Sequence, residues 1–423
     1  MTMALYQTYL SDPEMEHLCG DAALLGHVAG VEIALAEASA EAGLIAEPDA
    51  REIRERLAGW QPEASGLSAG TARHGIPLLP WLAAARARLS PAAAQALHHG
   101  ATSQDILDNA YLLMTRRAMA LLEERMRRLE AALQRLQLSC GALPMVGRTR
   151  GQHALPMALD HKLEAWRAPL LRQQQRLDQL KPRLLRLQLG GAVGTRQAWG
   201  QQGSHLSQAL ARRLALHPAF PWHSQRDTWV EWGQWLGLLS SHLGKVGQDL
   251  LLMAQSEVAE VRLPGGASSA MPHKQNPVGA EALLALARWN LSLLGGLQQA
   301  QLHAHERDGS GLALEWLSLP QMMTTTAASL RHALELTEGL TFDAAALRRP
   351  LEAQGGRLLG SLARQRLHAE LPPEVARASW QAAQAQIESQ PMTLAQALNQ
   401  VGQPPGMDWE AYLQPENHLG ERP

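Results

Sequence analysis

The stretch that decides the fold is WGQWLGLLSSHLGKVGQDLLLM, residues 232–253. Its large apolar side chains recur at alternating steps of four and three residues: Trp232, Leu236, Leu239, Leu243, Val246, Leu250 and Met253. Such a heptad seam is typical of long helices that pack at shallow angles in a bundle. The sequence therefore predicts one long helix here, with its seam packed against other helices.

Three further stretches show helical periodicity, at residues 106–138, 161–187 and 281–303. Pro169 and Pro182 fall inside the second stretch and are predicted to kink or stop that helix. Strand signals are scarce, because Phe occurs only 2 times and Tyr 4 times, while Leu, Ala, Gln, Glu and Arg dominate. The sequence therefore predicts an all-α protein built on long helices.

Breaks in the periodicity divide the chain into three predicted domains. Shorter stretches interrupted by Gly and Pro indicate an N-terminal helical cap over residues 1–103. The long-helix bundle is expected over residues 104–349, where part of the seam can pack between subunits. Further Pro breaks and a polar tail indicate a small C-terminal helical domain with a frayed end over residues 350–423.

Composition narrows the classes of partner. The 423 residues carry 38 Lys and Arg against 40 Asp and Glu, without a basic block that could follow a phosphate backbone, so nucleic acid is not expected. Cys19 and Cys140 are too few for a disulfide framework. No signal-peptide pattern and no unbroken apolar run of about eighteen residues is present. We expect a reduced, soluble, cytoplasmic protein without a membrane partner.

Two polar segments lie between the helical stretches and allow two interpretations each. HHGATSQDILDN, residues 98–109, offers Thr102 or Ser103 as an N-cap, but a helix N-terminus is also a site for anions. GRTRGQHALP, residues 147–156, can be a solvated loop or, through its two arginines, a segment that binds carboxylates.

A third polar segment, GGASSAMPHKQNP at residues 265–277, carries the strongest indication of function. Its glycines permit motion over a ligand, and Lys274 and Asn276 can hold a carboxylate. A structural turn has no need for Ser268, Lys274 and Asn276 together. A glycine-rich turn at residues 189–195, LGGAVGT, has no strand before it and is not a phosphate loop.

Together these segments resemble the fumarase/aspartase superfamily, whose serine loop reads G-S-S-x-M-P-x-K-x-N-P and is followed by a glutamate. Ala267 replaces the first glycine of that pattern, the other specified positions match, and Glu281 follows Ser268 at the family's spacing. The resemblance covers roughly residues 10–350. It implies a three-domain, mostly helical subunit, a homotetramer built around a shared helical bundle, and active sites that each combine three segments from three subunits.

The resemblance also implies the chemistry. Members add or eliminate a group across a carbon–carbon bond next to a carboxylate, without a metal or an organic cofactor. The serine at the position of Ser268 serves as acid or base at the carbon α to the carboxylate, and Lys274 would stabilise its alkoxide. Ser269 is adjacent and is the alternative to Ser268. Preorganised donors stabilise the charge that develops on the carboxylate.

Arg150 distinguishes this chain from many members, which have histidine at that position. The family's histidine, oriented by the loop glutamate, protonates the leaving group, whereas arginine keeps its proton. A carboxylate leaving group has a pKa of about 4 and needs no proton. The chain therefore resembles the branch of 3-carboxy-cis,cis-muconate cycloisomerases, the lactonising enzymes of protocatechuate breakdown (β-ketoadipate pathway). Adenylosuccinate lyase, or another fumarate-releasing lyase of the superfamily, is the alternative.

The expected ligand is a small anionic polycarboxylate. The resemblance implies four candidate catalytic residues: Ser268, Lys274, Glu281 and His153. The candidate substrate-binding residues are His98, Thr102, Ser103, Arg148, Thr149, Arg150, Gln152, Ser269, Met271, Asn276 and Arg307. His98 and His153 either bind a substrate carboxylate or orient a neighbour, and Arg150 pairs either with Glu281 or with substrate. The sequence leaves both questions open.

Overall fold

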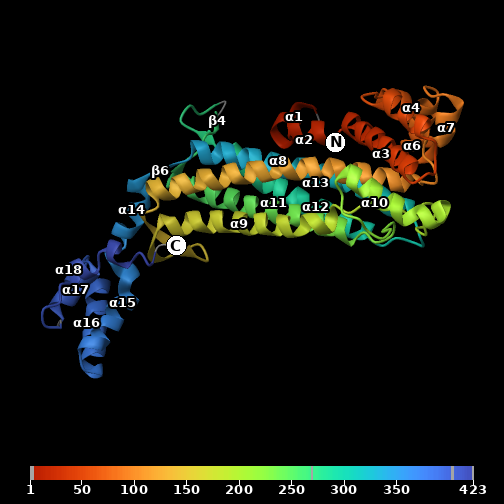
Figure 1. Cartoon of the computed structure of the whole chain (residues 1–423). Coiled ribbons are helices and arrows are strands. Elements are labelled where there is room, and N and C mark those ends of the chain that lie inside the picture. The colour runs from red at the N-terminus through yellow and green to blue at the C-terminus, as the bar shows by residue number, and fades with distance from the viewer. Residues whose placement is uncertain (1–3, 268–269, 402–403, 422–423) are drawn as a thin grey trace. The chain divides into compact units, whose positions relative to one another are not determined.

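The computed structural model describes residues 4–267, 270–401 and 404–421. The described part consists mainly of α-helices, with three two-stranded sheets (Figure 1). The chain forms two compact units, each assembled from three separate stretches of sequence. Unit 1 comprises Met1–Arg127, Leu171–Lys245 and Ala282–Ala333, and unit 2 comprises Arg128–Leu170, Val246–Glu281 and Leu334–Pro423. The boundaries of the three domains predicted above stay a prediction.

Long helices contribute residues to both units. They are α8 (Ser103–Cys140), α9 (Leu159–Leu184), α11 (Asp227–Met253), α12 (Val278–Ala300) and α13 (Gly309–Gly339). The heptad seam predicted at residues 232–253 is confirmed, because α11 spans it and every seam side chain is 8% exposed or less. The helices predicted at 106–138 and 281–303 correspond to α8 and α12.

Of the two prolines predicted to kink or stop α9, Pro169 does not stop the helix, and Pro182 lies close to its end. Pro169 lies inside the helix without ending it, and the helix ends at Leu184, two residues after Pro182. A proline within a helix removes a backbone hydrogen bond and crowds the preceding turn. Trp166 and Leu170, 1% and 2% exposed, flank Pro169, so packing of the apolar face offsets that penalty.

Unit 1 surrounds α3 with short helices. The elements outside the long helices are α1 (Ala4–Leu10), α2 (Pro13–Cys19), α3 (Asp21–Glu41), α4 (Glu47–Leu57), α5 (Ala64–His74), α6 (Leu78–Arg86), α7 (Pro91–Ala96), the 3₁₀ helix η1 (Gln197–Gln202) and α10 (Gly203–Leu214). Helix α3 packs against α4 and α10 and buries Leu25, Val28, Val31 and Leu35. Asp12 caps α2 by accepting from the Met15 N–H.

One described stretch, Pro13–Glu41, is long and apolar enough to cross a membrane when judged by length and composition alone. Core helices of soluble proteins and signal sequences near an N-terminus meet the same criterion. In this structure the stretch is interrupted at Gly20, between α2 and α3, and Glu32 in α3 is fully buried in unit 1.

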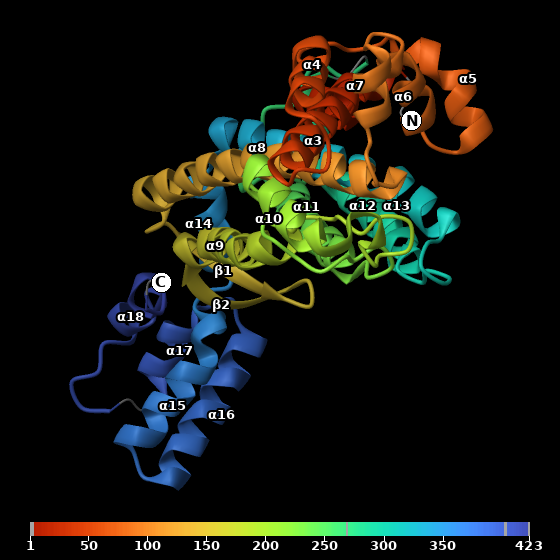
Figure 2. The same cartoon turned by 45° about the vertical axis from the view of Figure 1, so that its right-hand side comes forward.

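Unit 2 contains the sheets. Strands β1 (Pro144–Thr149) and β2 (Gln152–Ala158) form an antiparallel hairpin, which Figure 2 shows below α9. The sequence did not predict it. Arg150 and Gly151 form its turn with φ of 51° and 76°, the two positive values that a type I′ hairpin turn requires.

The other elements of unit 2 are short. They are β3 (Val261–Arg262), paired with β6 (Thr341–Phe342), and β4 (Gly266–Ala267), paired with β5 (Gln275–Asn276), followed by α14 (Ala344–Ala353), η2 (Arg357–Leu359), α15 (Gly360–Glu370), α16 (Pro373–Ser389), α17 (Leu394–Gln400), α18 (Trp409–Tyr412) and η3 (Pro415–His418). The C-terminal helices have their own core, which includes Leu359, Leu367, Leu398, Trp409 and Leu413.

Candidate active site

His98 lies in the segment that leads into α8. Its backbone is left-handed at φ 67°, and Gly100 follows at φ 70°. His98 Nδ1 lies 2.7 Å from Oε1 of Glu32, and Trp199 Nε1 donates to the His99 carbonyl at 3.0 Å. A Cβ on Gly100 would come within 2.5 Å of Trp199 Nε1, so the close approach requires glycine. These contacts hold the segment in one conformation.

Thr102 and Ser103 stand at the N-terminus of α8, as the sequence predicts. The helix begins at Ser103, and the Thr102 N–H donates to Asp105 Oδ2 at 3.0 Å. This is the return bond of a capping box, in which the third helical residue accepts from the N-cap backbone. Thr102 therefore occupies the N-cap position, at the end of the helix where the dipole favours an anion.

Asp105 fixes the glycine-rich turn beside this helix end. The N–H groups of Gly190 and Gly191 donate to its carboxylate at 2.8 and 2.9 Å, and His223 Nε2 lies 2.9 Å from Oδ1. Asp105 and His223 are 0% and 4% exposed. A Cβ on Gly190 would meet His223 Cε1 at 2.7 Å, so glycine lets the turn lie on the imidazole. Part of the polar first segment thus has a structural role.

A buried ion-pair group continues from Asp108, one turn further along α8. Arg226 donates to Asp108 Oδ1 and Oδ2, both at 2.9 Å, and its Nε donates to Glu315 at 2.7 Å. The three side chains are at most 4% exposed. Burial raises the pKa of Glu315 to about 6, although Arg226 acts in the opposite direction. The spacing of Asp105 and Asp108 on one helix face was the available sequence signal; none pointed to Arg226.

Arg307 contacts the same glycine-rich turn. Its Nη2 donates to the Ala192 carbonyl at 2.8 Å, and the side chain is exposed. One donor of the guanidinium is thereby engaged, and an arginine has five. Unit 1 therefore holds four of the predicted site residues: His98, Thr102, Ser103 and Arg307.

The β1–β2 hairpin of unit 2 borders a pocket of about 630 Å³ together with residues of α9 and α11. Arg148 and Thr149 are the predicted site residues that line it. Its wall includes Lys162 and Asp249, 3.7 Å apart, and Asp249 Oδ2 accepts from Trp166 Nε1 at 2.7 Å.

Arg148 is paired inside this unit. Its Nη2 and Nη1 donate to Glu260 Oε1 and Oε2 at 2.6 and 3.0 Å, and the Glu260 side chain is 0% exposed. Glu260 was not among the predicted site residues, because nothing in its local sequence pattern distinguishes it from other acidic residues. Much of the positive charge of Arg148 is therefore balanced within the subunit.

The remaining hairpin residues are exposed at its tip. Arg150, Gln152 and His153 are all exposed, and so is Glu281 in the first turn of α12. Neither Arg150 nor Glu281 has an ion-pair partner within residues 4–267, 270–401 and 404–421. In a single subunit, therefore, these two side chains do not pair with each other.

The serine loop is the connection of the β4–β5 hairpin. Gly266 pairs with Asn276 and Ala267 with Gln275, and the Lys274 N–H donates to the Met271 carbonyl at 3.0 Å. Lys274 is exposed, and Met271 is 42% exposed. Ser268 and Ser269 lie outside the described residues.

The described residues of the third segment do not line the pocket that Arg148 and Thr149 border. Figure 1 shows β4 above α8, and Figure 2 shows β1 and β2 below α9, so the two hairpins project from different sides of the unit. Through the Arg148–Glu260 pair, however, β1 is tied to the residue that directly precedes β3. Within the described residues, no group of three or more His, Cys, Asp and Glu could hold a metal ion.

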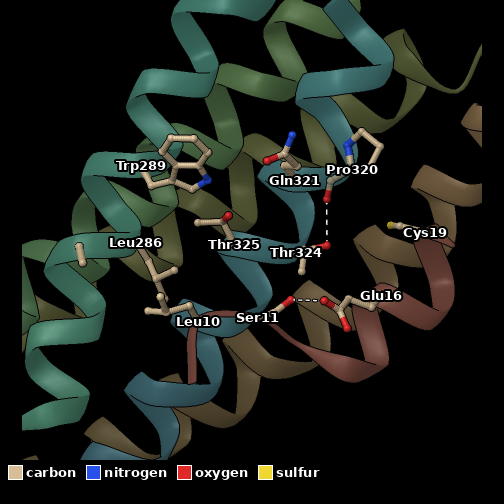
Figure 3. A pocket seen from close by; sticks show the side chains of 11 residues that line it. Leu10, Ser11, Glu16, Cys19, Leu286, Trp289, Pro320, Gln321, Thr324 and Thr325 are labelled. Carbon is tan, nitrogen blue, oxygen red and sulfur yellow. Dashed lines mark hydrogen bonds between the residues drawn. The ribbon is translucent and has the colours of Figure 1, made fainter. Parts of the chain in front are cut away.

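A second pocket, of about 490 Å³, lies in unit 1 and is shown in Figure 3. Leu286 and Trp289 of α12 line it, and Ser11 donates to Glu16 at its edge. None of the predicted site residues that the structure describes lines this pocket.

Comparison with known proteins identifies the family. A family profile described as lyase matches residues 75–289. The 3-carboxy-cis,cis-muconate cycloisomerase of Acinetobacter baylyi is 37% identical over 351 residues, which cover 79% of this chain and 77% of that protein. The chain belongs to this lyase family. The enzyme of the same name from Pseudomonas aeruginosa is 39% identical over 344 residues, covering 79% of this chain and 75% of that protein.

A solved member of the lyase family has the same fold. The crystal structure of 3-carboxy-cis,cis-muconate lactonizing enzyme from Pseudomonas putida matches with a TM-score of 0.92 at 34% identity, covering 99% of this chain and 96% of that one. The resemblance to the fumarase/aspartase superfamily and the all-α fold are thereby confirmed. The family profile spans all three polar segments and Glu281, whereas Arg307 lies beyond it.

Proposed function

We propose that this protein is a cycloisomerase that closes 3-carboxy-cis,cis-muconate to a carboxymuconolactone, a step in protocatechuate breakdown. The observation that carries the proposal is the similarity, over about four-fifths of the sequence and nearly all of the fold, to proteins that bear this activity in their names. Arg150 at the exposed hairpin tip supports it, because a carboxylate that adds or departs needs no proton-carrying histidine there.

The proposed reaction forms one carbon–oxygen bond and one carbon–hydrogen bond. A carboxylate oxygen of the substrate attacks the β carbon of the diene, and the π electrons move to the α carbon and its carboxylate. The Ser268 hydroxyl then gives its proton to the α carbon, and solvent returns a proton to the alkoxide, so the trianionic substrate becomes a dianionic lactone. Lys274 stabilises the alkoxide, and Asn276 donates to the substrate carboxylate.

The substrate's three carboxylates need cations from the protein. Arg150, Lys274 and Arg307 are exposed and can supply them. Arg148 was expected among these cations, but its pairing with Glu260 supports a different contribution, that of fixing the strand which carries Thr149. Thr102 and Ser103 add the N-terminus of α8. The other proposed binding residues are Gln152, Ser269 and Met271. The other proposed catalytic residues are Glu281 and His153.

We also propose a homotetramer in the cytoplasm, with each active site shared between subunits. The different sides from which the two hairpins of unit 2 project support this, because a second subunit is then needed to bring the segments together. Large apolar side chains are exposed on four long helices, as expected of surfaces that pack in an assembly: Leu138, Leu238, Trp289, Leu291 and Leu317, from 48% to 83% exposed.

The decisive experiment follows loss of the diene's ultraviolet absorbance after 3-carboxy-cis,cis-muconate is mixed with the purified protein. We expect rapid loss with the wild type and a fall of roughly 10²–10⁴-fold in the Ser268→Ala variant. Cleavage of adenylosuccinate or another fumarate adduct, without loss of the diene, would contradict the proposal. Arg150→His tests the leaving-group argument, since it should depress turnover if Arg150 binds substrate.

Shared sites can be tested by mixing two inactive variants. When Ser268→Ala and Arg150→Ala subunits are co-expressed, random assembly leaves about a quarter of the sites with both residues intact if these come from different subunits. Recovery of activity in the mixed protein is therefore expected. Complete absence of recovery, or a monomer by light scattering, would exclude the shared arrangement.

A further inference from the structure

The backbone of His98 adopts an unfavourable conformation that surrounding hydrogen bonds stabilise. A left-handed backbone disfavours any residue with a Cβ, and such conformations persist where the surroundings hold them, often at functional sites. Trp199 holds the next carbonyl, Arg86 Nη2 donates to the preceding one on Leu97 at 3.5 Å, and Thr102 is bonded to Asp105. Hydrogen bonds therefore hold the backbone on both sides of His98, and the contact with Glu32 orients its ring.

Glu32 provides the other half of the arrangement. It projects from the middle of α3, its side chain is 0% exposed, and its Oε1 lies 2.7 Å from His98 Nδ1. Its second oxygen, Oε2, is buried and has no hydrogen-bond partner among the described residues. A carboxylate removed from water requires a strong partner, and the His98 ring is the one that the structure provides.

The His98 ring joins this buried carboxylate to the surface. Its side chain is 14% exposed, and Nε2 has no hydrogen-bond partner in the described part of the chain. Because Nδ1 is engaged by Glu32, Nε2 is the nitrogen left for a ligand. A purely structural pair would gain nothing from this remaining exposure or from the strained backbone.

Three charged groups and burial determine the protonation of His98. Burial lowers its pKa, and the guanidinium of Arg86 on α6 acts in the same direction. The Glu32 carboxylate raises it through its charge and its hydrogen bond, and Asp105 on α8 adds a smaller increase. The outcome is a pKa above the usual value for histidine.

We propose that Glu32 is the positioning residue of His98, holding the imidazolium through Nδ1 so that Nε2–H binds a carboxylate of the substrate. This inference rests on the proposed function for the identity of the ligand. Two roles were left open for His98, binding a substrate carboxylate or orienting a neighbour. The inference assigns His98 to the first role. Glu32 in turn orients His98. The inference also assigns a role to a residue that is distant in sequence from all three polar segments.

The first test uses the intact wild-type protein. His98 is observed by NMR with ring-labelled histidine, assigned with the variant His98→Gln, and titrated with and without tricarballylate as a tricarboxylate probe. We expect His98 to titrate above the usual histidine pKa with Nδ1 bonded, and we expect the probe to shift its signal. Titration at or below the usual value, or a signal that the probe leaves unmoved, overturns the inference.

The second test changes Glu32. In Glu32→Gln, we expect KM for 3-carboxy-cis,cis-muconate to rise about tenfold at pH 8 with a smaller change in kcat, and the difference to narrow at pH 5.5. Loss of kcat/KM on the alkaline side should begin at lower pH, because Gln does not stabilise the imidazolium. Glu32→Asp should restore much of the wild-type profile. The matched control is Glu41→Gln, also on α3, whose carboxylate pairs with surface Arg212 and Arg213.

The outcomes separate this inference from the proposed function. If the wild type does not consume the diene but His98 still responds to tricarballylate and to Glu32→Gln, the proposed function fails and the positioning role stands. If the wild type is active while folded Glu32→Gln keeps both the His98 titration and KM, the positioning role is wrong.

Discussion

Arg148 and Glu260 form a bidentate ion pair, with Arg148 Nη2 2.6 Å from Glu260 Oε1 and Arg148 Nη1 3.0 Å from Glu260 Oε2. Glu260 is fully buried, while the Arg148 side chain keeps 27% exposure. Glu260 directly precedes β3, whose Val261 pairs with Phe342, and the serine loop follows. The pair therefore ties the hairpin of the second polar segment to the base of the third.

The asymmetry of this pair predicts unequal effects of substitution. Arg148→Met leaves a buried carboxylate unpaired, and we expect it to lower the free energy of unfolding by about 3 kcal/mol. Glu260→Gln should lower it less, because the freed Arg148 can reach water. The double variant should be more stable than Arg148→Met alone. Urea denaturation of all three variants gives the coupling energy.

Arg262→Met is the control for this comparison of Arg148 and Glu260 variants. Arg262 is the next-but-one residue after Glu260, but its side chain is 78% exposed and lies 3.4 Å from Asp343. We expect a change below about 0.5 kcal/mol. Equal losses for Arg262→Met and Arg148→Met would contradict the assignment of the Arg148–Glu260 pair as a buried interaction.

The Asp108–Arg226–Glu315 group should contribute strongly to the free energy of unfolding. Arg226→Met leaves two buried carboxylates close together, and we expect a loss of about 3–5 kcal/mol at pH 8. The loss should shrink as the pH falls, because burial raises the pKa of Glu315 and its protonation removes the repulsion between the two carboxylates. Adding Asp108→Asn and Glu315→Gln should recover most of the stability. Thermal unfolding at pH 8 and pH 5.5 measures each step, and a loss that does not depend on pH would be inconsistent with this account.

Gly100 should tolerate no side chain. Gly100→Ala combines a left-handed backbone with a Cβ 2.5 Å from Trp199 Nε1, and we expect a loss of about 2–4 kcal/mol and a higher KM. Gly59→Ala isolates the backbone effect, because Gly59 has the same φ of 70° with nothing within 4 Å of its Cβ, and should lose about 1 kcal/mol. Similar losses for the two variants in urea denaturation would mean that the contact with Trp199 is unimportant.

His27 on α3 should make the fold sensitive to acid. Burial first, and then Arg117 and Arg116, lower the pKa of His27 from 6.5 to about 4, and its Nε2 is buried without a partner in the described structure. His27 therefore binds a proton near pH 6.5 in the unfolded chain, but only near pH 4 in the folded chain. The free energy of unfolding should fall as the pH decreases through this window.

The variant His27→Leu should lose less stability than the wild type between pH 7.5 and pH 5, by about 1 kcal/mol once solvent screening is allowed for. His17→Leu, at an exposed position on α2, is the control. Urea denaturation at several pH values gives the comparison. Parallel pH profiles for the wild type and His27→Leu would contradict the prediction.

Much of the helical architecture could be predicted because its signals are local. The apolar residues of the seam from Trp232 to Met253 recur about once per turn of one helix, and every seam position proved buried. The N-cap of α8 could be narrowed to Thr102 or Ser103 because capping involves neighbours along the chain, and the structure selects Thr102. The β1–β2 hairpin could not be predicted, since its turn is Arg150-Gly151 and not the Asn-Gly or Asp-Gly that usually marks a type I′ turn.

The sequence by itself determined the fold class and the family, and it located the three segments proposed to carry the chemistry, because periodicity and motif spacing are properties of neighbouring residues. Only the tertiary structure decided which side chains pair with each other. His98 contacts Glu32, which is 66 residues away, and Arg148 pairs with Glu260, which is 112 residues away. The physical reason is that a charge removed from water must be balanced by a partner in space, and the folded chain brings that partner from distant sequence.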